Sequence, residues 1–167
     1  MKKFTPDLYY KNIFEINYKK LKKDKIKYIF FDVDNTILPY TTSNVSKEVK
    51  DLFNKLKKDG FVLILMSNSG SKRINKIKDD LKIDAYTSSF KPLKKNYKKV
   101  LKKYNKHEII FVGDQIITDV FGAKRNDLKV ILLDRLDNKE PLTTRINRIF
   151  ERFVIKINKF ERGKYYE

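Results

Sequence analysis

The sequence predicts an α/β protein, a three-layer α/β/α sandwich with a mainly parallel sheet. Short apolar runs alternate along the chain with segments whose apolar residues recur at helical spacing. The runs contain few polar residues, as expected for strands that helices bury on both faces. The chain has 167 residues, enough for one domain with a substantial core.

Each element follows from a local pattern. Strands are expected at residues 28–31, 61–66, 84–88, 108–112 and 128–133. Helices are expected over residues 45–56, 71–81 and 92–104, the first ended by Gly60 and the last opened by Pro92. Near the start of the chain, Thr5-Pro6-Asp7 predicts the N-terminus of a helix. Residues 19–27 are expected to form a basic linker that leads into the first predicted strand. Residues 1–25 are therefore assigned to an N-terminal arm.

The apolar run Tyr28 to Phe31 stops at two acids, Asp32 and Asp34. In extended geometry their side chains leave the same side of the chain. Ligands bind open parallel sheets at this carboxyl end, and neighbouring carboxylates usually serve a cation or acid/base chemistry. The alternative is a solvated turn whose Asp and Asn side chains cap the next segment.

Polar residues also follow the later strands. Ser67, Lys91 and Asp114 each come directly or closely after a predicted strand, and Asp119 follows five positions later. Carboxylates supply oxygen ligands for Mg²⁺, and a lysine and a hydroxyl can hold phosphoryl oxygens. Together these residues predict phosphoryl transfer, although Ser67 or Asp119 alone could be a helix cap or pairing residue.

The amino-acid composition excludes some types of site and weakly favours one type of binding partner. No cysteine is present, which excludes disulfides and thiolate metal sites. Neither a signal-peptide pattern nor an apolar run long enough to cross a bilayer is found, so a cytoplasmic protein is expected. The net charge of +18 invites a polyanionic partner, but 32 of the 39 basic residues are lysine, as coding bias produces.

Four motifs resemble those of the haloacid dehalogenase-like (HAD) hydrolases. Residues 32–36, Asp-Val-Asp-Asn-Thr, resemble the first motif, DxDxT. Ser67, Lys91 and Gly113-Asp114 with Asp119 resemble the second, third and fourth, in the same order. The resemblance covers residues 26–135, the expected catalytic core, and implies a Rossmann-like HAD fold with phosphatase activity. Lys91-Pro92 and residues 113–120 resemble the YqeG-type branch, subfamily IIIA, related to phosphatases of phosphatidylglycerophosphate.

The resemblance implies a role for each catalytic residue. Asp32 would be the nucleophile that forms an aspartyl-phosphate, and Asp34 the general acid and then base. Asp32, the backbone carbonyl of Asp34, and Asp114 would hold Mg²⁺. Lys91 would neutralise charge on the nucleophile and the transferring group, and Asp119 would orient Lys91 or a metal-bound water.

The remaining predicted residues lie on the substrate side. The resemblance implies that Ser67, with the backbone beside Asn68, hydrogen-bonds a phosphoryl oxygen, and that Thr36 shapes the turn after the acids. Gly113 would let the backbone approach a ligand closely. About 30 residues separate Asp34 from Ser67 and about two dozen separate Ser67 from Lys91, too few for a cap domain. An open site suits a large phosphorylated substrate.

Residues 141–160 predict a C-terminal amphipathic helix. One stripe is apolar, and basic residues lie mostly elsewhere around the helix; the stripe contains Leu142, Ile146, Ile149, Phe150, Phe153, Ile157 and Phe160. Such a helix can pack on the domain or on a second subunit, or lie on an anionic membrane. The sequence leaves these alternatives open.

Three functions are consistent with these patterns. The leading one is a Mg²⁺-dependent phosphomonoester hydrolase acting on phosphatidylglycerophosphate or another large substrate, peripheral to the inner face of the membrane. The second is a polynucleotide-end or phosphoprotein phosphatase guided by the lysines of residues 94–103. The third is a non-enzymatic RNA-binding protein on a HAD scaffold. Nucleic acid is the less favoured partner, because base and phosphate clamps prefer arginine.

Overall fold

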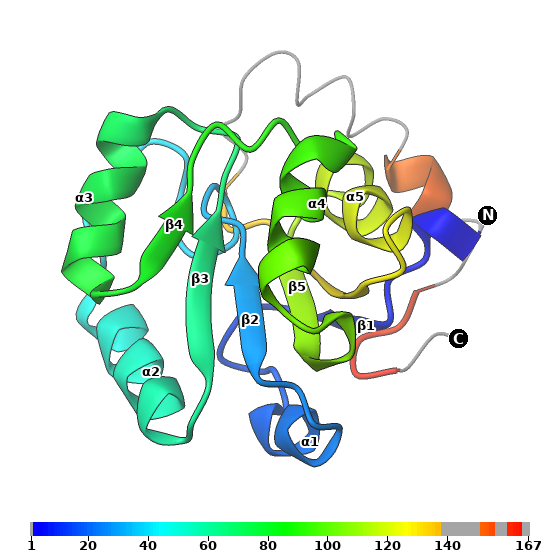
Figure 1. Cartoon of the computed structure of the whole chain (residues 1–167), viewed down its shortest axis with the longest axis horizontal. Coiled ribbons are helices and arrows are strands. Elements are labelled where there is room, and N and C mark those ends of the chain that lie inside the picture. The colour runs from blue at the N-terminus through cyan, green and yellow to red at the C-terminus, as the bar shows by residue number, and fades with distance from the viewer. Residues whose placement is uncertain (1, 138–150, 156–159, 165–167) are drawn as a thin grey trace.

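The computed structural model describes residues 2–137, 151–155 and 160–164. Their strands form one six-stranded sheet in the order β1-β6-β5-β2-β3-β4, in which every pairing is parallel. The strands therefore all end at one edge, here called the carboxyl edge, and begin at the opposite amino edge (Figure 1). Their bounds are β1 Leu8–Tyr10, β2 Tyr28–Phe31, β3 Val62–Met66, β4 Asp84–Tyr86, β5 Ile109–Gly113 and β6 Lys129–Leu133.

Helices connect the strands. Residues 151–155 are also helical. The named elements are η1 Lys2–Phe4, α1 Tyr18–Lys23, α2 Lys47–Lys58, α3 Ser71–Leu81, α4 Lys94–Lys103, η2 Lys106–Glu108, the π-helical turn η3 Ile116–Val120 and α5 Phe121–Lys124.

Side chains that alternate along each strand build two cores, one on each face of the sheet. Ile29 and Phe31 of β2 pack in a core with residues of α1, α2 and α3. Phe30 points to the other face, into a core with residues of α4, η3 and α5. The predicted three-layer α/β/α sandwich is confirmed. Between Asp34 and Lys91, where a cap domain could be inserted, the chain forms only α2, β3, α3 and β4, as predicted.

The predicted helix after Thr5-Pro6-Asp7 is wrong. The chain instead forms the edge strand β1, which pairs with β6. Asp7 fixes this pairing, since its carboxylate accepts a hydrogen bond from Val130 N (2.7 Å) and pairs with Lys124 (2.7 Å). Pairing with a distant strand thus overrides the local helix-start pattern. The predicted linker over residues 19–27 is also wrong in part, because α1 occupies most of it.

The predicted C-terminal helix lies largely outside the described residues, which here include only 151–155 and 160–164. Within them, Val154 and Phe160 are buried in the second core, whereas Phe153 is 63 % exposed. The helix bounds 141–160 and the division of the chain into arm, core and helix remain predictions. Among the described residues, no helix is long and apolar enough to cross a membrane.

Candidate active site

A lysine bound between two carboxylates forms the centre of the carboxyl edge. Lys91, which follows β4, places its Nζ 2.6 Å from an oxygen of Asp32 after β2 and 2.6 Å from an oxygen of Asp119 in η3. All three side chains are buried. The structure therefore brings together two predicted catalytic residues, Asp32 and Lys91, and the predicted positioning residue Asp119 from three separate segments.

Asp114 completes an acidic group beside this pair. Strand pairing brings it to Asp32, whose backbone N donates to Val112 O (2.8 Å) and so extends the β2–β5 ladder. One carboxylate oxygen each from Asp32, Asp114 and Asp119 lies within 4.8 Å of the others. Three carboxylates face one ammonium, so the group as a whole attracts a divalent cation that prefers oxygen ligands.

Thr36 lies between the carboxylates. It is buried, and its hydroxyl is 3.4 Å from both Asp32 Oδ2 and Asp114 Oδ1. A hydroxyl carries one proton and can donate to only one of them at a time. Thr36 therefore orients the acids instead of reaching outward to a substrate.

Burial and like charges shift the protonation of this cluster. Burial raises the pKa of the Asp32 carboxyl; Lys91 lowers it, the charges of Asp119 and Asp34 raise it, and the result is about 7. Burial alone would lower the pKa of Lys91, but the carboxylates of Asp119 and Asp32 outweigh burial and raise it. Lys91 thus stays a cation, and it lowers the pKa of Asp32 by less than burial and the neighbouring carboxylates together raise it.

Asp119 is placed by a π-helical turn and by a glycine. The turn η3 brings Asp119 back beneath Gly113, where a Cβ on Gly113 would lie 2.3 Å from Asp119 Cγ. Gly113 therefore makes room for Asp119, and the close approach of its backbone to a ligand remains a prediction. Asp119 uses its second oxygen to accept from Gln115 N (3.1 Å). With both oxygens bonded, Asp119 is better suited to orienting Lys91 than to holding a metal.

Asp34 has partners that the sequence analysis missed. Its carboxylate pairs with Arg73 of α3 and accepts a hydrogen bond from the Ser69 hydroxyl. Arg73 also donates from Nε to Thr42 O (3.0 Å), which ties α3 to the loop after β2. The sequence does contain one feature that could have drawn attention to Arg73, which is the only arginine in the first 124 residues of a lysine-rich chain. Asp34 is not one of the three grouped carboxylates, but its charge acts on Asp32.

The residues after β3 anchor the backbone that carries Lys91. The Asn68 side chain accepts from Lys91 N (2.7 Å) and donates to Lys91 O (3.0 Å), so it supports Lys91 and leaves only its backbone for a substrate. Ser67 is fully buried, and its Oγ accepts from Ser69 N (3.1 Å). That Ser67 binds a phosphoryl oxygen remains a prediction.

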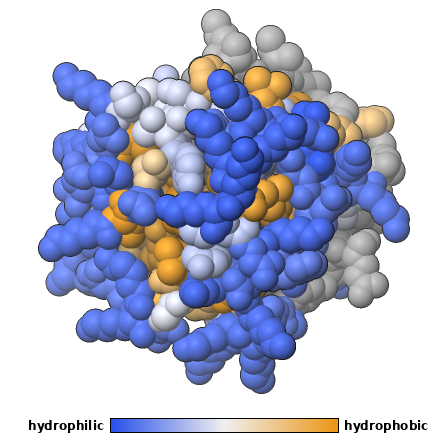
Figure 2. All heavy atoms as spheres, viewed as in Figure 1, coloured by the Kyte–Doolittle hydropathy of each residue, from blue (hydrophilic) through white to orange (hydrophobic). Residues whose placement is uncertain are grey.

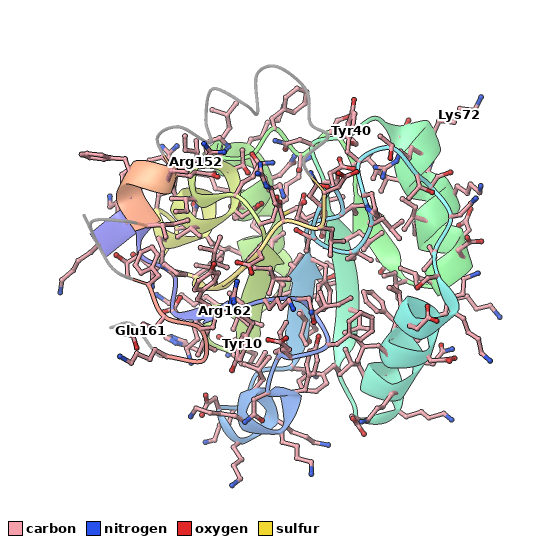
Figure 3. All side chains as sticks on the ribbon, turned by 180° about the vertical axis from the view of Figure 1, so that it is seen from behind. Tyr10, Tyr40, Lys72, Arg152, Glu161 and Arg162 are labelled. Carbon is pink, nitrogen blue, oxygen red and sulfur yellow. The ribbon has the colours of Figure 1, made fainter. Side chains whose placement is uncertain are left out.

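A cavity of about 350 Å³ adjoins Asp114. Arg135, Arg152 and Arg162 line it, and Arg162 also pairs with Asp134 there. Figure 3 shows Arg152 and Arg162 on the same side of the molecule, on the two described C-terminal segments. A larger hollow of about 570 Å³ lies at the amino edge, but none of the predicted catalytic residues lines it. The cavity beside Asp114 is therefore the better candidate for binding a substrate.

Comparison with known proteins agrees with this geometry. The family model described as mitochondrial PGP phosphatase matches residues 1–137. The chain belongs to this family. A curated relative from Bacillus subtilis (strain 168), named "Probable phosphatase YqeG", is 31 % identical over 154 residues, covering 91 % of this chain and 90 % of the relative. The chain is thus a HAD-type phosphatase of the YqeG type, subfamily IIIA, as the motifs predicted.

Solved structures share the fold at low sequence identity. YfnB from Bacillus subtilis, named as a HAD-hydrolase and bound to magnesium, superposes with a TM-score of 0.55 at 14 % identity over 70 % of this chain and 90 % of YfnB. The cobalt-bound deoxy-D-mannose-octulosonate 8-phosphate phosphatase YrbI from Haemophilus influenzae gives 0.51 at 14 % identity, over 82 % of this chain and 90 % of YrbI. These matches bear out the predicted HAD-like fold.

Proposed function

We propose that this phosphatase hydrolyses a phosphomonoester on a phospholipid head group, phosphatidylglycerophosphate, with Mg²⁺ and an aspartyl-phosphate intermediate. The observation that carries the proposal is the buried group of Asp32, Asp114 and Asp119 bound to Lys91 at the carboxyl edge. The family description and the absence of any domain inserted over residues 34–91 support a large substrate. The cavity beside Asp114 contains three arginines together with Asp114, Asp134 and Glu151, and its arginines would meet the remaining anionic part of such a head group.

The proposed chemistry uses residues already in place. An oxygen of Asp32 attacks phosphorus, and the bond from phosphorus to the substrate oxygen breaks, which leaves an aspartyl-phosphate. Asp34 gives its proton to the leaving alkoxide and then takes one from a water. That water attacks phosphorus and releases inorganic phosphate and the Asp32 carboxylate. Mg²⁺, held by Asp32, the Asp34 carbonyl and Asp114, would offset the repulsion between the anionic nucleophile and the phosphate.

Lys91 and Arg73 prepare these two acids. Lys91 holds one oxygen of Asp32 (2.6 Å) and keeps a positive charge beside the transferring group, and the Thr36 hydroxyl faces the other oxygen (3.4 Å). Arg73 and the Ser69 hydroxyl fix the position of Asp34. Asp119 acts through Lys91 and would not touch the substrate.

The test measures phosphate release with Mg²⁺ from phosphatidylglycerophosphate in mixed micelles, beside an aryl phosphate and an end-phosphorylated oligonucleotide. We expect selective turnover of the lipid. Asp32→Asn should lower turnover by roughly 10³-fold or more and reduce the rise in melting temperature that Mg²⁺ causes. Asp51→Asn, an exposed change on α2, is the matched control and should behave like the wild type.

Other outcomes would support the alternatives. Turnover of the oligonucleotide that is strongly suppressed by salt would indicate a polynucleotide-end phosphatase. Tight RNA binding with no phosphomonoester turnover would contradict the proposal and favour a binding scaffold. Wild-type turnover by Asp32→Asn would refute Asp32 as the nucleophile.

A further inference from the structure

Exposed apolar side chains gather in the loops that surround the candidate active site. Tyr40 follows β2, Phe90 and Leu93 follow β4, and Leu136 follows β6. Phe90 and Leu93 are 65 % and 58 % exposed. Figure 2 shows apolar side chains at the upper rim of the molecule beside hydrophilic ones, and Figure 3 shows Tyr40 at that rim. Because the strands are parallel, all these loops lie at the carboxyl edge.

The turn from Phe90 to Leu93 is held firmly although its apolar side chains face water. Leu93 N donates to Phe90 O (2.8 Å), and Asn96 binds the carbonyl of Ser89 just before the turn (2.9 Å). Phe90 has a φ of +50°, a left-handed conformation that bulky residues rarely adopt and that tends to mark functional positions. Lys91, inside the turn, is bound to Asp32, so the turn is fixed relative to the site.

The start of α4 is poorly suited to stabilising a helix. Leu93 occupies the N-cap position and makes no capping hydrogen bond, where a short polar residue is preferred. Lys94 and Lys95 follow, with no acidic residue in the first turn, although the helix dipole disfavours cations there. Both lysines are exposed. Two apolar side chains followed by two cations are instead the pattern that binds an anionic surface with an apolar interior.

We propose that the Phe90–Leu93 turn docks the carboxyl edge onto an anionic lipid bilayer. Phe90 and Leu93 enter the boundary between head groups and acyl chains, while Lys94 and Lys95 meet lipid phosphates. Charge complementarity and an apolar tip together favour a bilayer. Single-stranded nucleic acid fits less well, because an aliphatic side chain such as Leu93 offers no ring for base stacking.

This inference rests on the proposed function for its purpose, since Lys91 in the same turn would bring Asp32 to a phosphate at the membrane surface. The docking proposal and the proposed function can nevertheless be disproved independently. Binding to vesicles requires no turnover, and turnover of lipid in detergent micelles requires no docking to a bilayer.

The experiment is vesicle flotation of the whole chain, with phosphatidylcholine alone or mixed with phosphatidylglycerol. The wild type should bind the anionic vesicles, and more weakly as salt rises. The double variant Phe90→Ser/Leu93→Ser should lose roughly tenfold or more of its partition coefficient. The double variant Lys94→Glu/Lys95→Glu leaves the turn intact, and its partition coefficient should also fall by at least about tenfold. Both should retain wild-type turnover of a soluble aryl phosphate.

Two single variants make the test specific. Phe14→Ser removes another exposed phenylalanine, between β1 and α1, and should leave binding unchanged. Phe153→Ser examines the C-terminal segment, the rival membrane contact. Loss of binding with Phe153→Ser alone, unchanged binding in both double variants, or no binding by the wild type would overturn the proposal. So would binding of single-stranded RNA through the turn in place of vesicles.

Discussion

The two edges of the sheet follow different rules of stability. At the amino edge, α2 ends before Gly60, whose φ is +93°, and α3 ends in the left-handed Lys82, as well-terminated helices do. At the carboxyl edge, α3 and α4 begin at Gly70 and Leu93 without a side-chain capping bond. There, too, three buried carboxylates share one lysine. The missing capping bonds and the buried charges therefore lie at the carboxyl edge, whereas left-handed residues other than glycine occur at both edges.

This difference between the two edges indicates that the carboxyl edge carries the functional site. Exceptions to capping, burial and charge rules are expected at functional sites and are compensated by the rest of the fold. Substitutions at the carboxyl edge should therefore change activity more than stability, with one exception at Lys91.

Lys91→Met should produce the largest combined loss. It leaves Asp32 and Asp119 buried without their cation, and removing one partner of a buried ion pair costs about 3–5 kcal/mol. We expect turnover of the aryl phosphate to fall roughly 10²-fold or more and the melting temperature by about 10 °C. Mg²⁺ should raise the melting temperature of this variant more than that of the wild type, because a cation replaces the lost charge.

Lys99→Met is the control for Lys91→Met, since Lys99 is an exposed lysine of α4. It should change neither turnover nor stability. A Lys91→Met protein as active as the wild type would show that the ion pairs serve the fold alone.

Gly113→Ala should reduce activity without unfolding the protein. The added Cβ would lie 2.3 Å from Asp119 Cγ, so Asp119 must move and Lys91 loses one of its two carboxylates. Displacement by about 1 Å can lower turnover roughly 10²-fold, while the overpacking costs about 1–3 kcal/mol. Gly70→Ala, at the same edge, meets no atom within 4 Å and should behave like the wild type in both assays.

Arg73→Ala should have a smaller effect that concerns Asp34. The change removes the ion pair with Asp34 and the bonds to Thr42 O, so both the acid and the loop after β2 lose their support. We expect turnover to fall about tenfold and stability by about 1–3 kcal/mol. Arg73→Lys keeps the charge without the fork of donors and should recover only part of the activity. Full activity in Arg73→Ala would mean that Asp34 needs no such support.

The sequence predicted the parts of the site that depend on local pattern. Apolar runs located five strands, and parallel pairing then placed Asp32, Lys91 and Asp114 at one edge. Two other features depend on contacts between distant segments, which periodicity does not encode. Arg73 reaches Asp34 across 39 positions, and β1 exists because it pairs with β6.

Other features that the sequence did not reveal have a more local origin. The π-helical turn that returns Asp119 beneath Gly113 has no hydrophobic period of its own, so the sequence did not reveal that this glycine makes room for Asp119. For Asn68 the sequence predicted a role of the backbone alone, and it did not reveal that the side-chain amide binds the backbone of Lys91. Which partner such a polar side chain takes depends on loops whose shape the sequence does not reveal.

The smallest expected effect compares one strained residue from each edge. Lys82 and Phe90 both have left-handed backbones, with φ of +52° and +50°, so a glycine at either position should relieve about 1 kcal/mol of strain. This relief alone should raise the melting temperature by about 2–4 °C for each variant. The greater conformational entropy that glycine gives the unfolded chain reduces the rise. Only Phe90→Gly should also weaken binding to anionic vesicles, because Lys82 lies at the amino edge. Equal stabilisation with unequal vesicle binding would assign the strain at Phe90 to docking, whereas unchanged vesicle binding in both would leave it without a function.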